Sequence, residues 1–124
     1  MSVANQRKRI VLLDDSDLIR ELVRETLEQA GYEVIDTATP FGFSNMLRRE
    51  KPDLALLDVT MPTLRGDKLA EIAIQHGVGC PIVLFSDRPE AELDSMVKAV
   101  KAAGYIRKTA DMDDIVRSVE RFLK

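Results

Sequence analysis

The sequence is poor in cysteine, in aromatic residues and in long apolar runs. Its one cysteine, Cys80, excludes an intramolecular disulfide and a zinc site with several cysteine ligands, and is typical of a reducing compartment. Tryptophan is absent, and aromatic residues make up only 5% of the chain. The longest apolar runs, at 10–13, 54–57 and 82–85, are far shorter than the roughly 20 residues that cross a bilayer. No apolar segment precedes Arg7, so a secretory signal is not indicated. We therefore expect a cytoplasmic protein without a membrane partner.

The charge balance argues against another class of function. The 124 residues include 18 basic and 21 acidic side chains, which give a formal net charge of −3. A nucleic-acid-binding protein needs clustered basic charge to displace phosphate counterions, so we expect no direct nucleic-acid partner. A chain of this length buries roughly two thirds of its surface on folding, which is enough for one core. We expect a single domain over residues 1–124, with residues 1–7 as a flexible N-terminus.

The apolar residues alternate along the chain between short continuous runs and helical stripes. Continuous runs are typical of strands that are buried on both faces, and stripes spaced i, i+3, i+4, i+7 predict amphipathic helices. The sequence predicts strands at 10–13, 34–35, 54–57, 82–85 and 105–106, and helices around 19–30, 40–47, 64–73, 93–103 and 112–123. Five such units favour an α/β fold, a doubly wound (βα)5 three-layer sandwich of the flavodoxin type. Its five parallel strands are expected in the order 2-1-3-4-5.

Polar residues follow four of the five predicted strands. Asp14 and Asp15 follow the first strand, and Asp58 follows the third. Ser86 follows the fourth strand and Lys108 the fifth. Because ligands of doubly wound sheets bind beyond the carboxyl ends of the strands, these side chains mark a candidate site. Three neighbouring carboxylates require a cation, and oxygen ligands favour Mg²⁺ over zinc. With that charge neutralised, Asp58 could attack phosphorus, stabilised by the lysine and the hydroxyl.

A simpler interpretation exists for each residue taken alone. An aspartate at a strand end is usually a turn residue, and Ser16 or Asp17 is expected to cap the helix that follows. Turn chemistry explains the set as a whole less well, because acids follow two strands, a hydroxyl follows a third and a lysine follows a fourth.

Four segments carry a resemblance to a known family. They are 10–15 (IVLLDD), 52–62 (PDLALLDVTMP), 81–86 (PIVLFS) and 103–108 (AGYIRK). In order and spacing they resemble the receiver domain of bacterial two-component response regulators, including the stand-alone, chemotaxis-regulator-like kind. Each segment is a weak signal alone, whereas the set is specific and extends from about residue 8 to residue 123.

The resemblance implies a role for each matching residue of the site. Asp58 matches the aspartate that accepts a phosphoryl group from a histidine kinase or a phosphotransfer protein. Asp14 and Asp15 match the acidic pair that holds Mg²⁺, and Thr60 matches the residue whose backbone carbonyl also binds the metal. Lys108 matches the lysine that binds the phosphoryl group.

The resemblance also implies a conformational switch. Ser86 matches the hydroxyl that moves toward the phosphoryl group, and Tyr105 matches the aromatic residue that turns inward as it does so. The downstream protein target is then expected on the face formed by the helix at 93–103, the fifth strand and the last helix. The kinase is expected to contact mainly the first helix and the loops around the acidic residues. A monomer or a weak homodimer fits this family.

Two features depart from the usual pattern. The family usually has a proline after the lysine, joined by a cis peptide bond, where this chain has Thr109. A cis bond before a residue other than proline costs about 2.5–4 kcal/mol, so we predict a trans bond between Lys108 and Thr109 and a rerouted loop up to Asp111. Phe41 and Phe43 flank Gly42 in the second helical segment, and we interpret both as core contacts rather than a binding patch.

Other functions remain to be weighed. Aspartate-nucleophile phosphatases resemble one another in a D-x-D motif whose second aspartate is the acid-base. In this chain the residue two positions after Asp58 is Thr60, so that acid is missing. A nucleotide binder is disfavoured because the first β–α turn is acidic and lacks glycine. A receiver-fold interaction module that works without phosphorylation is the main alternative. Because the sequence finishes with its last predicted helix, we expect either a stand-alone receiver or one excised from a longer regulator or hybrid kinase.

Overall fold

The computed structural model describes residues 7–59, 66–75 and 79–124. Its five strands form one parallel sheet in the order β2-β1-β3-β4-β5. The strands are β1 (Arg9–Leu13), β2 (Glu33–Thr37), β3 (Leu54–Asp58), β4 (Ile82–Ser86) and β5 (Gly104–Arg107). Each predicted strand is present, and the predicted strand order is confirmed.

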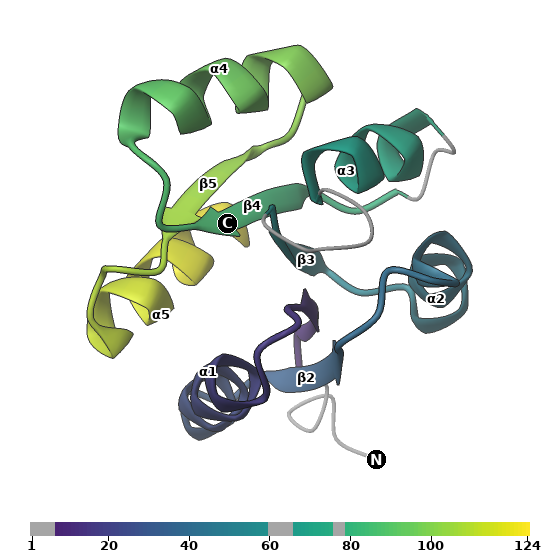
Figure 1. Cartoon of the computed structure of the whole chain (residues 1–124). Helices are drawn as coiled ribbons and strands as arrows, with labels where there is room; N and C mark the ends of the chain where they lie inside the picture. The colour runs from purple at the N-terminus through teal and green to yellow at the C-terminus, as the bar shows by residue number, and fades with distance from the viewer. Residues whose placement is uncertain (1–6, 60–65, 76–78) are drawn as a thin grey trace.

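Five helices alternate with the strands and cover both faces of the sheet (Figure 1). They are α1 (Asp17–Gln29), α2 (Phe43–Glu50), α3 (Gly66–Gln75), α4 (Glu90–Val100) and α5 (Met112–Phe122). Helices α1 and α5 lie on one side of the sheet, and α2, α3 and α4 lie on the other (Figure 1). Among the described residues, no helix combines the length and hydrophobicity that crossing a bilayer requires.

The central strands are apolar on both faces because helices cover both. In β1, Val11 and Leu13 belong to the core under α2, α3 and α4, whereas Ile10 and Leu12 belong to the core under α1 and α5. Strands β3 and β4 divide their residues in the same alternating way. This two-sided burial explains why the strands are visible in the sequence as continuous apolar runs.

The starts of two helices follow ordinary capping chemistry. The Ser16 hydroxyl accepts a hydrogen bond from the backbone N–H of Ile19 at 3.2 Å and caps α1, as expected. The Asp111 carboxylate accepts one from the N–H of Asp114 at 2.8 Å and caps α5. Both helices begin at the carboxyl edge of the sheet, because α1 closely follows β1 and α5 closely follows β5.

The structure corrects the prediction for Phe41. Phe43 is buried as expected, but Phe41 is 78% exposed. The turn explains the difference, since Gly42 adopts a left-handed conformation with φ of 74° and α2 begins only at Phe43. The chain therefore reverses direction between the two aromatic residues, and only the second faces the core.

Two further predictions can be compared with the structure, namely the end of α4 and the peptide bond after Lys108. Helix α4 ends at Val100 rather than continuing to Ala103, because Lys101 adopts a left-handed conformation with φ of 63° that stops the helix. The predicted trans bond between Lys108 and Thr109 is confirmed, as no cis peptide bond occurs among the described residues.

Candidate functional site

The polar residues that follow the strands meet at the carboxyl edge of the sheet. Asp58 is the last residue of β3 and pairs with Phe85 of β4, and Ser86 is the last residue of β4. The backbone N–H of Lys108 donates to the carbonyl of Ser86 at 2.9 Å, which extends the β4–β5 pairing by one residue. At the other side, the N–H of Asp14 donates to the carbonyl of Thr37 at 3.2 Å and extends the β1–β2 pairing. The strand register thus fixes the backbone position of each of these residues.

Three carboxylates form an acidic cluster, defined here as Asp14, Asp15 and Asp58. One carboxylate oxygen from each lies within 4.8 Å of the others. Asp14 is completely buried and Asp58 almost so, whereas Asp15 is exposed. The Asp14 carboxylate also accepts a hydrogen bond from the N–H of Ser16 at 2.9 Å. Two buried carboxylates and one accessible one converge within the reach of a single ion.

Lys108 supplies positive charge to this cluster. Its Nζ lies 2.7 Å from Oδ2 of Asp14 and 3.2 Å from Oδ1 of Asp58, and 5.3 Å from the centre of the Phe85 ring. Burial alone would lower the pKa of Lys108, but its hydrogen bond to Asp14 and the charges of Asp14 and Asp58 together raise it. The lysine is therefore fully protonated at neutral pH and compensates part of the carboxylate charge.

The donor set of the acidic cluster fits a hard divalent cation. All three side chains offer oxygen ligands, and the accessible position of Asp15 leaves room for water in a coordination shell. Three carboxylates facing one ammonium group leave an excess of negative charge, which a divalent ion would neutralise. Asp14, Asp15 and Asp58 are thus the residues that would hold Mg²⁺.

A sequence profile of the response regulator receiver domain matches residues 10–120. The chain belongs to this receiver domain family. Among curated proteins, the receiver is 30% identical over 119 residues to the chemotaxis protein CheY of Halobacterium salinarum, covering 94% of this chain and 97% of that protein. It is 24% identical over 116 residues to sporulation initiation phosphotransferase F of Bacillus subtilis, covering 94% of both chains.

Solved structures agree with this assignment. The receiver superposes on the chemotaxis protein CheY4 of Vibrio cholerae with a TM-score of 0.87, at 26% identity, over 94% of this chain and 99% of that one. Other curated relatives are longer. The chain covers 48% of the transcriptional regulatory protein YxdJ of Bacillus subtilis, to which it is 32% identical over 114 residues, or 90% of this chain. Receiver domains are the signalling modules of two-component systems, and they interact with histidine kinases and phosphotransfer proteins.

The two residues expected to switch the receiver lie on adjacent strands. Ser86 is buried, and its hydroxyl accepts a hydrogen bond from the N–H of Arg88 at 3.1 Å. Tyr105 of β5 is half-buried and packs against the core under α4. Partial burial raises the pKa of the Tyr105 hydroxyl, and the nearby carboxylates of Asp94 and Glu90 on α4 add to this rise. Thr60, the remaining predicted ligand, lies outside the described residues.

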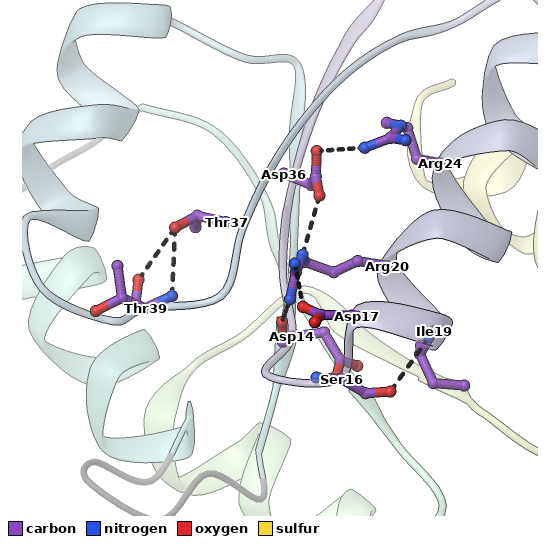
Figure 2. Close-up of polar contacts among 9 residues, drawn as sticks. All are labelled: Asp14, Ser16, Asp17, Ile19, Arg20, Arg24, Asp36, Thr37 and Thr39. Carbon is purple, nitrogen blue, oxygen red and sulfur yellow. Dashed lines mark hydrogen bonds and ion pairs between the residues drawn. The ribbon is translucent and has the colours of Figure 1, made fainter.

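One set of contacts beside the acidic cluster was not predicted from the sequence (Figure 2). Arg20 of α1 reaches both the turn after β1 and the end of β2, where it pairs with Asp36 at 3.0 Å. Arg24, one turn further along α1, pairs with the other oxygen of the same carboxylate at 3.0 Å. An acid inside a short strand and two arginines four residues apart on a predicted helix were the available signal. The packing of α1 against β2 brings them together, and the sequence pattern did not indicate which residues of the two elements meet.

Proposed function

We propose that this receiver domain accepts a phosphoryl group on Asp58 from a phosphohistidine of a kinase or a phosphotransfer protein. The observation that carries the proposal is the position of the buried Asp58 carboxylate, 3.2 Å from the Lys108 ammonium and within reach of Asp14 and Asp15. A carboxylate oxygen of Asp58 attacks phosphorus, the N–P bond breaks, and its electron pair leaves on the imidazole nitrogen. An acyl phosphate is the product.

The neighbouring residues support this transfer electrostatically. Asp14 and Asp15 would hold Mg²⁺ together with Asp58, and the backbone carbonyl of Thr60 is proposed as a further ligand. When bound, Mg²⁺ neutralises negative charge on the phosphoryl oxygens. Lys108 places its ammonium group beside the accepting carboxylate, where it stabilises the charge that the phosphoryl group brings. We propose that the domain signals through this modification and does not turn over a separate substrate.

The proposed output is a change in protein contacts. The Ser86 hydroxyl can donate a hydrogen bond to a phosphoryl group on Asp58, because both residues end neighbouring strands. Movement of the segment after β4 then frees space for Tyr105 to turn inward, which shifts a population between two states. We propose that a downstream protein reads the face formed by α4, β5 and α5. We further propose a single domain that works in the cytoplasm as a monomer or weak homodimer.

The decisive experiment is phosphorylation by a small phosphodonor with Mg²⁺. We expect the intact mass to rise by one phosphoryl group, with an acid-stable, base-labile bond, and we expect Asp58→Asn to show no rise. The matched control is Asp53→Asn, an exposed acid just before the same strand, which should be modified like the wild type. Absence of modification with every donor would favour a phosphorylation-independent interaction module. Repeated rapid hydrolysis of a phosphoester would favour a phosphatase.

A further inference from the structure

Arg20 connects three segments around the acidic cluster through its whole guanidinium group (Figure 2). Its Nη1 donates to the backbone carbonyl of Asp14 at 2.9 Å, and its Nε donates to the Asp36 carboxylate at 3.0 Å. Its Nη2 donates to the carboxylate of Asp17 at 2.6 Å. Only 16% of the side chain is exposed. The planar guanidinium therefore fixes the turn after β1 against both α1 and the end of β2.

The backbone of Asp14 is held by β2 on one side and by Arg20 of α1 on the other. Its N–H donates to the carbonyl of Thr37, and its carbonyl accepts from Arg20, which is itself fixed by the neighbouring Asp36. Strand β2 lies at the edge of the sheet and carries none of the residues of the acidic cluster. It nevertheless contacts the backbone of the first acid directly and fixes the arginine that binds its carbonyl.

The same hydrogen bond orients the next acid along the chain. The carbonyl of Asp14 and the N–H of Asp15 belong to one planar peptide unit, so holding the carbonyl fixes the direction in which Asp15 leaves the backbone. Asp15 is exposed, so packing restricts its side chain less than that of Asp14. Its convergence with the two buried acids depends on the orientation of this peptide plane.

We propose that Arg20, held by Asp36, is a positioning residue that aligns Asp14 and Asp15 for divalent cation binding. The proposal rests on the metal site of the proposed function and adds to it a residue that does not touch the ion. Residues that orient metal ligands typically change metal affinity by about 10-fold to 100-fold when replaced.

The sign of the effect separates positioning from simple electrostatics. Arg20 is positively charged and lies next to a cation site, so removing its charge should strengthen cation binding if charge alone mattered. Loss of the hydrogen bond to the Asp14 carbonyl should instead weaken binding, because the ligands lose their alignment. A fall in affinity on removal of a positive charge is thus the expected signature.

The chain offers a matched control for this comparison. Arg24 lies four residues after Arg20 on α1 and pairs with the same Asp36 carboxylate at 3.0 Å. Arg20, by contrast, also donates the hydrogen bond to the Asp14 carbonyl. Arg24→Gln therefore removes a charge and an ion pair with Asp36 while leaving the Arg20 clamp on the turn in place.

The test is titration of the purified protein with Mn²⁺, followed by the electron paramagnetic resonance signal of free Mn²⁺. We expect Arg20→Gln to bind about tenfold more weakly than wild type, and Arg24→Gln to bind as tightly or more tightly. Urea unfolding in the presence of a chelator reports the stability of each variant without metal. Arg20→Lys retains the charge but cannot reach the carbonyl and Asp36 together, so it should also bind more weakly than wild type.

The outcomes distinguish the inference from the proposed function. If the wild type binds no Mn²⁺, the proposed metal site is wrong and the positioning role falls with it. If the wild type binds and Arg20→Gln binds equally well or more tightly, only the positioning role is wrong. Equal weakening in Arg20→Gln and Arg24→Gln would also overturn it, since the loss would then follow from the ion pairs with Asp36. Should Arg20→Gln fail to fold, wild-type affinity in Arg20→Lys would overturn the proposal.

Discussion

At the scale of single residues, the buried charges determine most of the chemistry. A carboxylate that is removed from water is strongly destabilised unless an opposite charge or hydrogen bonds compensate it. Asp14 has both, through Lys108 at 2.7 Å and the N–H of Ser16 at 2.9 Å. Burying the Asp14 carboxylate lowers the stability of the fold, and an aspartate that served only in a turn could stay exposed. The position of Asp14 beside Asp58 at the sheet edge therefore indicates a functional role.

Cys80 provides a residue-scale prediction in which pH dependence is the measurement. Partial burial and the nearby charge of Asp53 raise the pKa of the Cys80 thiol to about 11. Only the thiolate reacts with alkylating agents, so at about pH 8 we expect alkylation about a hundredfold slower than for an unperturbed thiol. The rate should rise as the pH approaches the raised pKa, as measured by mass spectrometry. Because Cys80 is the only cysteine, the modified site is unambiguous.

The same pKa has a consequence for stability with a definite sign. An unfolded thiol ionises near its ordinary value of about 8.5, whereas the folded thiol keeps its proton up to the raised pKa. Between these values the unfolded state binds fewer protons, so the thiol lowers the free energy of unfolding as pH rises. Cys80→Ala should lose this contribution. Alkylation of the native protein as fast as that of the urea-unfolded protein at about pH 8 would contradict the raised pKa.

The two phenylalanines around Gly42 show what sequence alone could not predict at this scale. Hydrophobicity predicts burial on average and was right for Phe43, but Phe41 is exposed. The direction of each side chain depends on the left-handed turn at Gly42, and a sequence pattern does not fix that dihedral angle. By contrast, Asp14, Asp58, Ser86 and Lys108 could be placed together, because their position follows from strand ends in a parallel sheet.

At the scale of elements, apolar runs predicted the strands better than they predicted helix ends. Strands β1, β3 and β4 are buried on both faces, so their cores stand out as continuous runs. The stripe of α4 continues past Val100 in the sequence, yet the helix stops there because Lys101 takes a conformation that usually favours glycine. Contacts between elements, such as Arg20 with Asp36, depend on how a helix packs against a strand, and residue spacing does not reveal them.

The contact of α5 with β5 gives an element-scale prediction. A Cβ atom at Gly104 would lie 2.6 Å from Cζ and 2.7 Å from Cε1 of Phe122, closer than van der Waals contact allows. Gly104→Ala should therefore displace the ring and lower the free energy of unfolding by about 1–3 kcal/mol. Urea unfolding measures this change.

A second substitution controls for the cause of that loss. In Phe122→Leu the ring is absent, so adding Gly104→Ala in that background should cost much less than in the wild type. The single variant Phe122→Leu gives the baseline. An equal loss in both backgrounds would mean that the ring contact is not the reason why this strand begins with glycine.

At the scale of the whole molecule, topology concentrates the acidic charge. The order β2-β1-β3-β4-β5 places β1 and β3 side by side, so the acids at their carboxyl ends meet. Apart from Asp14, Asp15 and Asp58, the chain has as many acidic as basic residues, 18 of each. These three acids equal the excess of acidic over basic residues in number, and Lys108, which pairs with Asp14 and Asp58, leaves the four side chains at this edge of the sheet with a net charge of −2.

This concentration of charge predicts that divalent cations stabilise the whole fold. A ligand that binds only the folded state adds about 2.7 kcal/mol to the free energy of unfolding at a hundred times its dissociation constant. We expect Mg²⁺ to raise the thermal unfolding midpoint above that in sodium chloride of equal ionic strength. Asp15→Asn should remove most of this rise, and its metal-free midpoint should equal or exceed that of the wild type, because the substitution removes one of three neighbouring negative charges without disturbing the core. Glu25→Gln, which removes an exposed acid on α1, should respond to Mg²⁺ like the wild type. An equal response of all three proteins would place the stabilising ions elsewhere, since general screening acts on every surface charge whereas a site at the acidic cluster requires this carboxylate.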